Sequence, residues 1–242
     1  MIFSMKNLII TLLAWLLILV CPPGCSPAPK SNTQMFDNAG STIFSSMRTP
    51  SGEKLLAAQD GPERSALGDP VIDLGTYKLE VTGLVDSSFS LTWNQISNMT
   101  EYQTDTILMY CVEGWEVYGK WEGIKVKDLL ERALVRSTGK YVLFSTADGY
   151  STALPIAYLL KYNALLAYNV NGRPLKASDG FPLRLICFGK YGYKWAKWVT
   201  RLQVIDKAKS GFWESNGFPD EANVPLSRRQ FYEGKNVQEL VY

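Results

Sequence analysis

The chain offers one strong candidate for redox chemistry, the cysteine that opens the segment 111–115. Cys111 lies between an apolar run at residues 107–110 and a turn-rich stretch with Gly114 and Trp115. None of the 242 residues is a histidine, which excludes Ser-His-Asp and Cys-His triads and histidine-ligated zinc or haem. A thiolate where a buried strand meets a loop suits a redox metal better than a hard cation. The alternative is that Cys111 is a small buried hydrophobic residue, as free cysteines often are.

A second candidate site is the segment 184–209, which is basic and rich in aromatic residues. Its seven cations and five aromatic residues are interleaved: Arg184, Lys190, Lys194, Lys197, Arg201, Lys207 and Lys209, with Phe188, Tyr191, Tyr193, Trp195 and Trp198. Gly189 and Gly192 allow a tight loop, whose backbone can approach a ligand closely. Lysine side chains and loop N–H groups together form an anion site that suits a phosphate.

Three interpretations of this segment compete. A solvated charged face explains the interleaved tryptophan and tyrosine residues poorly. A surface for single-stranded nucleic acid has this composition, but the net charge of +2 and the export signal described next argue against nucleic acid. A site for a phosphate-bearing cofactor explains the glycines, the lysines and the aromatic residues together, so we favour it.

The first 25 residues have the pattern of an export signal. Lys6 precedes an uncharged apolar run at residues 8–21, which is short for a membrane span but fits the hydrophobic core of a signal peptide. Gly24-Cys25 resembles the processing site of bacterial-type lipoproteins, so we expect a lipid anchor at Cys25. A soluble secreted form and an uncleaved anchor are the alternatives. The expected location is therefore the cell surface or the periplasm.

Composition divides the chain into four segments: an export or lipoprotein signal at 1–25, a flexible tether at 26–69, a folded domain at 70–220 and a C-terminal extension at 221–242. The tether has no sustained period, apart from one short helix expected near residues 53–59. After processing, Cys111 and Cys187 are the cysteines that remain in the folded part. In an exported protein they could form a disulfide, which is the structural alternative to a metal-bound Cys111.

The folded part alternates strand signals with a few short helices. Strands are expected at residues 77–81, 107–110, 141–144, 164–170, 183–187 and 198–205, and helices at 93–96, 126–134 and 155–162. Asn171-Gly172 is a strong two-residue hairpin signal. The helix 126–134 carries apolar residues at core-packing spacing and charged residues on its other face. Together these signals indicate one α+β domain.

Seven motifs occur in an order and at spacings that point to a family. They are Tyr77–Gly83 (YKLEVTG), Cys111–Trp115 (CVEGW), Phe144–Tyr150 (FSTADGY), Gly180–Arg184 (GFPLR), Lys190–Lys194 (KYGYK), Lys197–Val199 (KWV) and Gly211–Glu214 (GFWE). Through these motifs the chain, from about Gly75 to Asp220, resembles the oxidoreductase molybdopterin-binding domain. Sulfite oxidases share this domain with the periplasmic catalytic subunit that reduces methionine sulfoxide. The resemblance implies a mixed, β-rich single domain of the sulfite-oxidase molybdopterin-binding type.

The resemblance also implies a molybdenum–molybdopterin cofactor with Cys111 as its sole protein ligand. Glu113 would support that ligand or handle protons, so it is a catalytic candidate beside Cys111. Six residues would bind the cofactor: Thr146 beside the metal, Asp179 and Arg184 at the pterin, the backbone of Trp195 and Ala196 along the pocket, and Lys197 with Arg184 at the phosphate. No residue before Gly75 matches the N-terminal contacts that some family members make to the pterin.

The function implied by the resemblance is that of an exported, lipid-anchored oxidoreductase. It would move an oxygen atom onto or off a small substrate, such as a sulfoxide or a related oxide. Phe218 stands where sulfite-oxidising relatives carry a tyrosine, which disfavours sulfite because a phenyl ring cannot donate a hydrogen bond. The chain has no ligand set for haem or an iron–sulfur cluster, so a separate redox partner, such as a membrane protein near the anchor, must exchange electrons with it.

One alternative belongs to a different functional class. The signal has Lys6 as its one cation and is not of the twin-arginine type that usually exports loaded molybdopterin enzymes. A non-catalytic cell-surface binding module, which keeps the fold without the metal and joins Cys111 to Cys187, would be consistent with that signal. Retention of Cys111, Arg184 and Lys197 argues for the enzyme instead.

Overall fold

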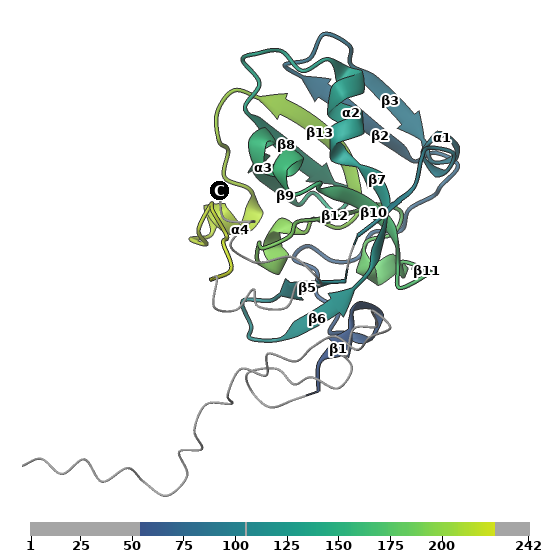
Figure 1. The fold of residues 1–242 in the computed structure, drawn as a ribbon, viewed down its shortest axis with the longest axis vertical. Coiled ribbons are helices and arrows are strands. Elements are labelled where there is room, and N and C mark those ends of the chain that lie inside the picture. The colour runs from purple at the N-terminus through teal and green to yellow at the C-terminus, as the bar shows by residue number, and fades with distance from the viewer. Residues whose placement is uncertain (1–53, 105, 226–242) are drawn as a thin grey trace, which may run out of the picture. The chain divides into compact units, whose positions relative to one another are not determined.

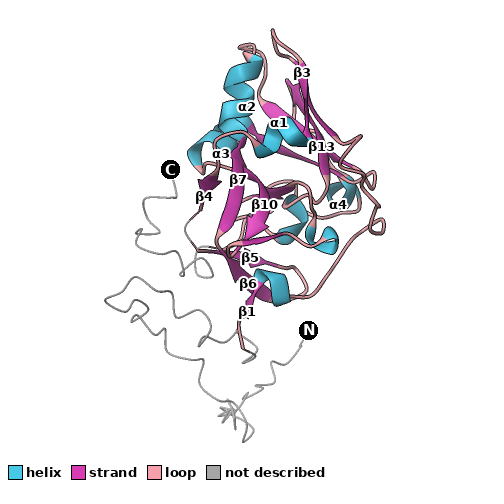
Figure 2. Cartoon of the chain, turned by 90° about the vertical axis from the view of Figure 1, so that its right-hand side faces the viewer, coloured by secondary structure: helices cyan, strands magenta, loops and turns pink. Residues whose placement is uncertain are grey.

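The computed structural model of the chain describes residues 54–104 and 106–225, all within the unit Phe36–Tyr242. Within these residues, three β-sheets are accompanied by four short α-helices (Figures 1 and 2). No helix in these two ranges is long and apolar enough to cross a membrane. The signal segment 1–25, with Cys25, lies outside the described residues.

The first five-stranded sheet is built on the alternating pattern of strands β2 and β13. Its order is β3 (Phe89–Thr92), β2 (Lys78–Gly83), β13 (Val199–Ile205), β8 (Tyr141–Thr146) and β9 (Ser151–Pro155). β2 and β13 run parallel, and the other neighbours are antiparallel. Leu79 and Val81 of β2 and Leu202 and Val204 of β13 are buried, because alternate residues of a strand face the same side.

The second sheet surrounds strand β10. Its order is β11 (Arg173–Pro174), β10 (Leu165–Val170), β7 (Trp121–Lys125) and β4 (Tyr102–Gln103), and β12 (Arg184–Ile186) also pairs with β10. Asn171 and Gly172 join β10 to β11 with φ angles of 52° and 72°. Positive φ at both turn residues is the requirement of a tight hairpin turn, so the expected hairpin is confirmed.

The third sheet is small and has strand β5 at one edge. Its order is β1 (Leu56–Ala57), β6 (Glu116–Gly119) and β5 (Ile107–Tyr110), with β1 parallel and β5 antiparallel to β6. All four residues of β5 are buried. Ile107 and Met109 belong to the main hydrophobic core, whereas Leu108 and Tyr110 belong to a second, smaller cluster with Leu55 and Val224. β5 is therefore buried on both faces.

The helices follow from local signals. α1 (Trp93–Ser97) begins with a capping box, in which the Gln95 N–H donates to Thr92 Oγ1 at 3.4 Å and the Thr92 N–H donates to Gln95 Oε1 at 2.9 Å. α2 (Val126–Ala133) buries one apolar face and ends at Leu134, whose φ of 55° is left-handed. α3 (Ile156–Lys161) and α4 (Phe212–Ser215) are shorter. Three 3-10 turns complete the set: η2 (Ala58–Asp60), η3 (Ala177–Asp179) and η4 (Gly192–Lys194).

The strands and helices expected from periodicity are confirmed, with limits shifted by no more than two residues at either end. The prediction of a short helix near residues 53–59 is wrong for the residues that the structure describes. Leu56–Ala57 form strand β1 and are followed by a 3-10 turn. These two residues pair with Val117–Tyr118 of β6, far away in the sequence. A strand of two residues is too short to show a period.

The packed body extends beyond residues 70–220 at both ends. β1 precedes this range, and the Tyr191 N–H donates to the Ala222 carbonyl at 2.9 Å on the C-terminal side. The Val224 N–H donates to the Gly189 carbonyl at 3.0 Å. Parts of the expected tether and of the expected C-terminal extension are therefore integrated into the fold.

The close approach of β7 and β10 gives a stability prediction. A methyl group on Gly123 would lie 2.1 Å from the Leu166 carbonyl oxygen and 2.6 Å from Ala167 Cα. Both are backbone atoms of β10, so relief requires a shift of the strand. We expect Gly123→Ala to lower the free energy of unfolding, measured in urea, by roughly 1–3 kcal/mol or more.

The matched control for Gly123 is Gly75→Ala. There the nearest atom to an added methyl group is Asp73 Oδ1 at 3.3 Å, the end of an exposed side chain that can move away. An equal loss of stability in the two variants would contradict the backbone clash as the cause.

Candidate functional site

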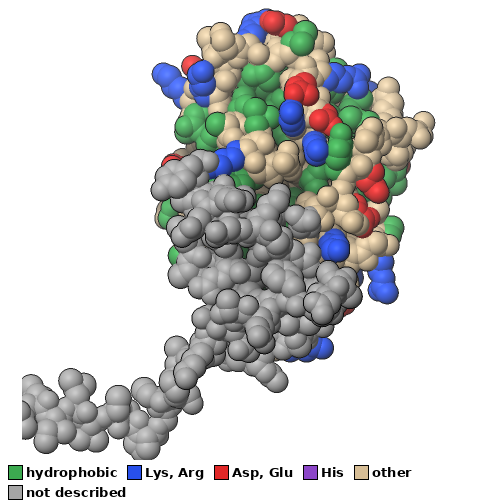
Figure 3. Space-filling view, in the orientation of Figure 1, with side chains coloured by type: hydrophobic (Ala, Val, Ile, Leu, Met, Phe, Trp, Pro, Cys, Tyr) green, Lys and Arg blue, Asp and Glu red, His purple; other side chains and the backbone are tan. Residues whose placement is uncertain are grey.

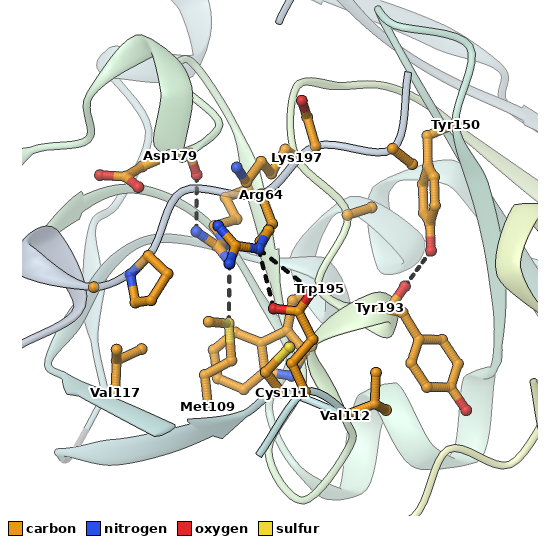
Figure 4. Close-up of a pocket in the computed structure, with 18 of the residues that line it drawn as sticks. Arg64, Met109, Cys111, Val112, Val117, Tyr150, Asp179, Tyr193, Trp195 and Lys197 are labelled. Carbon is orange, nitrogen blue, oxygen red and sulfur yellow. Dashed lines mark hydrogen bonds and ion pairs between the residues drawn. The ribbon is translucent and has the colours of Figure 1, made fainter. Parts of the chain in front are cut away.

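The candidate site is a cavity of about 360 Å³, a size typical of small-molecule sites. Its wall comes from several separate parts of the sequence: residues 58–66, the β5–β6 hairpin, the β8–β9 turn, the start of β12, the loop 192–198, and Trp213 with Phe218. Figure 4 shows that Arg64, Met109, Cys111 and Lys197 gather around this cavity from different elements.

Cys111 lies on the cavity wall, directly after β5. Its N–H donates to the Trp115 carbonyl at 2.9 Å, and the Gly114 N–H donates to the Cys111 carbonyl at 3.2 Å, which closes a tight turn. Gly114 has a φ of 96°, a left-handed value that favours glycine. The thiol is free and half-buried. Burial raises its pKa above the ordinary value, and the nearby carboxylate of Glu113 adds to the rise, whereas the backbone N–H of Glu113 and the charge of Arg64 oppose it.

Glu113 lies on the same wall and is fixed by two donors. Arg64 Nε donates to its Oε2 at 3.0 Å, and Trp115 Nε1 donates to the same oxygen at 2.8 Å. The hydrogen bond from Trp115 lowers the pKa of this carboxyl group, and the hydrogen bond and charge of Arg64 lower it further. The carboxylate is therefore held beside the cysteine turn in its charged form.

The segment that carries Arg64 was not expected at the site. Six residues before Gly75 line the cavity: Ala58, Gly61, Pro62, Arg64, Ser65 and Ala66. The pairing of β1 with β6 anchors this segment, and Asn171 Nδ2 donates to Gln59 Oε1 at 2.6 Å. The sequence motifs gave no sign of these residues, because the contacts that anchor the segment join it to residues far away in the sequence.

Arg184 is the most deeply buried cation on the cavity wall. It opens β12, and its Nη1 donates to the Asp179 carbonyl oxygen at 3.0 Å, while its Nη2 lies 3.0 Å from Met109 Sδ. Burial lowers the pKa of Arg184 to about 10, although the charge of Asp179 opposes the change. Its Nε has no hydrogen-bond partner among the described residues.

Asp179 and Lys197 lie beside this guanidinium. Asp179 Oδ2 is buried without a partner in the described part of the chain, and burial raises the pKa of its carboxyl group. Lys197 Nζ donates to the Ser178 carbonyl at 2.5 Å. Burial lowers the pKa of Lys197 to about 8, and the charge of Arg184 lowers it as well. The inner part of the cavity therefore contains two cations and a carboxyl group whose hydrogen bonding is incomplete.

The other expected cofactor residues divide into two groups. Trp195 and Ala196 are buried and line the cavity, and Trp195 Nε1 donates to the Lys190 carbonyl at 3.0 Å. Thr146 is not among the residues that line the cavity. Its hydroxyl donates to an Asp148 carboxylate oxygen and lies 2.9 Å from the Tyr150 carbonyl. Asp148 and Tyr150 of this loop reach the cavity instead.

The basic segment 184–209 does not form one anion site. Lys190 Nζ donates to the Glu221 carbonyl and to Asn223 Oδ1, and Lys194 is buried in an ion pair with Glu214. Figure 3 shows cationic and anionic side chains interspersed over the visible face, with neither sign gathered into a patch. Charge counts along the sequence do not reveal side-chain direction, so the expected contribution of the loop lysines to an anion site is wrong. The cavity retains two cations of the segment, Arg184 and Lys197.

A disulfide between Cys111 and Cys187 is not formed, because both are free thiols. Cys187 is fully buried, and its Sγ lies 3.5 Å from the Lys194 carbonyl oxygen. Burial raises the pKa of the Cys187 thiol. The disulfide form of the binding-module alternative is therefore excluded by this structure.

An aromatic wall completes the cavity and was not identified from the sequence as a unit. Tyr193 and Phe218 meet edge to face with ring centroids 5.4 Å apart, and Trp213 and Phe218 do so at 5.1 Å. All three residues line the cavity. Trp213 belongs to the GFWE motif, so part of the signal was present, but the contact with Tyr193 depends on the tertiary fold.

Comparison with known proteins agrees with these features. The family model of the oxidoreductase molybdopterin binding domain matches residues 66–213. The uncharacterized oxidoreductase YuiH of Bacillus subtilis is 35% identical over 147 residues, which are 60% of this chain and 74% of that protein. The putative protein-methionine-sulfoxide reductase subunit YedZ1 of Azospira oryzae is 33% identical over 148 residues, which are 61% of this chain and 56% of that protein.

A solved structure shows the same fold. The sulfane dehydrogenase SoxCD from Paracoccus pantotrophus superposes with a TM-score of 0.60 at 23% identity, over 73% of this chain and 50% of that chain. The expected β-rich α+β fold is thereby confirmed. The chain spans between half and three quarters of the length of these three proteins. Because the family model covers well over half of its residues, the chain belongs to the oxidoreductase molybdopterin binding domain family, a family of molybdenum-dependent oxidoreductases.

Proposed function

We propose that the protein is a molybdopterin-dependent enzyme that transfers an oxygen atom to or from a small substrate, such as a sulfoxide or a related oxide. The observation that supports this most is that one cavity holds both the free thiol of Cys111 and the buried, partly unpaired guanidinium of Arg184. A thiolate is a soft metal ligand, and a guanidinium is the preferred partner of a phosphate.

The polar atoms of the cavity fit such a cofactor. Arg184 Nε, Asp179 Oδ2 and Trp121 Nε1 are buried without hydrogen-bond partners among the described residues. Buried polar groups are nearly always paired, so three unpaired polar atoms on residues that line one cavity indicate a polar ligand. An organic group with a phosphate and ring N–H groups would provide an acceptor for the guanidinium and donors for the carboxylate.

Each residue then has a defined role. Cys111 would hold the molybdenum, Arg184 and Lys197 the phosphate, and Asp179 the pterin ring, with the backbone of Trp195 and Ala196 lining the pocket. When bound, the cofactor supplies the two-electron redox chemistry of oxygen-atom transfer. The protein positions the cofactor and limits the access of water.

Two of the expected roles change in this proposal. Arg64 and Trp115 both donate to Glu113 and lower the pKa of its carboxyl group, so we assign Glu113 to support of the cysteine turn. Thr146 would act through Asp148, which accepts its hydroxyl and lines the cavity, instead of by direct contact with the cofactor.

One relative, which is named as a subunit of a putative protein-methionine-sulfoxide reductase, supports an organic oxide as substrate. Phe218 lines the cavity and has no hydroxyl group to bind or protonate an oxyanion such as sulfite. That relative is named as a subunit, which also supports a separate redox partner.

The location that we propose is outside the cytoplasm, at the cell surface or in the periplasm, with a lipid anchor at Cys25. The support for this location is the signal pattern of residues 1–25. An anchor would keep the domain close to a membrane-bound electron donor or acceptor.

Metal content tests the proposal directly. The full chain, expressed in a host that makes molybdopterin, is expected to carry close to one molybdenum atom per chain by elemental mass spectrometry. Cys111→Ser is expected to lose most of this metal and the activity while it keeps the fold, because a neutral hydroxyl is a poor substitute for a thiolate.

Cys187→Ala is the matched control for Cys111→Ser. It removes the other thiol of the described part, which is fully buried. This variant should retain the metal with a moderate loss of stability from the small void. Full activity and metal retention in Cys111→Ser would show that Cys111 is not the ligand.

The pKa of Lys197 gives a second test, on the chain without cofactor. In the folded state this pKa is about 8, against an ordinary value of 10.5. Between these values the unfolded state binds more protons, so the free energy of unfolding rises with pH through this window. Lys197→Met removes the titrating group and is expected to be more stable than the native chain below pH 8, with an advantage that shrinks toward pH 10.5.

The measurement is urea unfolding of both proteins from pH 7 to pH 10. Loss of the hydrogen bond to the Ser178 carbonyl adds an offset that does not vary with pH. Lys78→Met, at an exposed lysine of β2, controls for the removal of one positive charge. A difference between the native chain and Lys197→Met that stays flat across this range would contradict a buried, destabilised ammonium.

A further inference from the structure

The outer part of the cavity carries an ion pair beside the candidate metal ligand. Arg64 Nε lies 3.0 Å from Glu113 Oε2, and the two side chains are 60% and 49% exposed. By contrast, Arg184 is only 7% exposed and lies in the inner part. In Figure 4, Arg64 lies across the cavity close to Cys111. The Arg64–Glu113 pair therefore forms part of the solvent-exposed wall of the cavity near Cys111.

The cavity wall carries both cationic and acidic side chains. Three cations and three carboxyl groups line it: Arg64, Arg184, Lys197, Glu113, Asp148 and Asp179. In the proposed function, Arg184 and Lys197 hold the phosphate of the cofactor. Arg64 is then the remaining cation on the wall, and Glu113 is bound to it directly.

This pairing determines how strongly the entrance of the cavity attracts anions. An unpaired Arg64 would attract an anionic ligand, whereas a carboxylate 3.0 Å away largely cancels that field. Trp115 Nε1, at 2.8 Å, holds the same carboxylate oxygen in place. The compensating charge is therefore fixed in position, and the net charge that an approaching anion meets at this pair is close to zero.

Another part of the cavity lining is apolar. Tyr193, Trp213 and Phe218 line it in edge-to-face contact, and Val112, beside Cys111, adds an aliphatic side chain that is 48% exposed. Aromatic faces favour apolar or polarisable groups, such as thioethers and alkyl chains. A substrate that combines a neutral oxide with an apolar substituent matches both parts of the lining.

We propose that Glu113 is a specificity-determining residue, which neutralises Arg64 and thereby makes the entrance select neutral substrates over oxyanions. This inference rests on the proposed function and deepens it, because it defines the class of oxide that reaches Cys111. It assigns Glu113 a role in the charge of the entrance that is separate from its support of the cysteine turn.

The test uses the Cys111 thiol of the full chain, produced in a host that cannot make molybdopterin, as a reporter of local charge. The chain is treated separately with iodoacetate, which is anionic, and iodoacetamide, which is neutral. The rate of modification at Cys111 is read from its peptide by mass spectrometry. Differences in thiol reactivity cancel in the ratio of the two rates. The ratio therefore reports how strongly the entrance attracts or repels an anion.

Glu113→Gln keeps the shape of the side chain and its acceptor for Trp115 but removes the charge. We expect the iodoacetate-to-iodoacetamide ratio to rise about 2- to 5-fold at low ionic strength, and the increase to shrink in high salt because both groups are half-exposed. Arg64→Gln should change the ratio in the opposite direction. If Glu113→Gln leaves the ratio unchanged, the proposal is overturned.

The matched control is Glu80→Gln. Glu80 forms a similar exposed pair with Arg201, at 2.7 Å, and neither residue lines the cavity. This variant removes the same charge elsewhere and should not change the ratio. A purely structural role of Glu113 would accelerate both reagents equally through a looser turn, and that result would also count against the proposal.

A second readout separates this inference from the proposed function. On the cofactor-loaded full chain, inorganic sulfate is titrated calorimetrically, and Glu113→Gln is expected to bind it several-fold more tightly than the native chain. If no molybdenum is found but the alkylation ratio rises, the charge role holds and the proposed function fails. If molybdenum is bound but neither sulfate affinity nor the ratio changes, the proposed function stands and the role of Glu113 is wrong.

Discussion

Burial of strand β5 on both faces is the constraint on which the site depends. Ile107 and Met109 face the main core, and Leu108 and Tyr110 face the smaller cluster. A slip of one residue would exchange these two sets, so the register of β5 is strongly specified. Since Cys111 follows Tyr110 directly, its place on the cavity wall is specified with equal strength. The same strand also brings Met109 Sδ to the Arg184 guanidinium.

The smaller cluster connects the site to both ends of the described chain. Leu55 precedes β1 and Val224 lies near the end of the described residues, yet both pack with Leu108 and Tyr110. The segment that follows Leu55 carries Arg64 to the entrance of the cavity. A domain cut at residues 70 and 220 would therefore lose the contacts that bury one face of β5, as well as one partner of the entrance ion pair.

The sequence predicted those features whose cause is local. The capping residue Thr92 and the apolar spacing of helix α2 lie within a few residues of the elements that they determine. Strands β6 and β7 were not predicted, because they contain buried Glu116 and Glu122, which interrupt any apolar period. Their burial depends on neighbouring strands and on polar partners elsewhere in the fold, such as Gln103 Nε2, which donates to Glu122 Oε1 at 2.8 Å.

The same distinction applies to the site. The order of the sequence motifs predicted that Cys111, Arg184 and Lys197 share one cavity. In the structure all three line the same cavity. Arg64 was missed because a non-local parallel strand pair places it. Thr146 was placed at the cofactor, but its hydroxyl is used within its own turn.

Two of the buried cations of the basic segment, Arg184 and Lys194, differ in how far the protein satisfies their charge. Lys194 donates to the Ala153 carbonyl at 3.1 Å and forms an ion pair with Glu214, so its charge is satisfied within the protein. Arg184 is bonded to a carbonyl oxygen and a thioether, and its Nε is left without a described partner. An unsatisfied buried donor costs roughly 1–3 kcal/mol. A phosphate-bearing ligand would recover this free energy on binding and, by linkage, stabilise the fold. In the proposed function, the incomplete pairing of Arg184 would couple ligand binding to the stability of the domain.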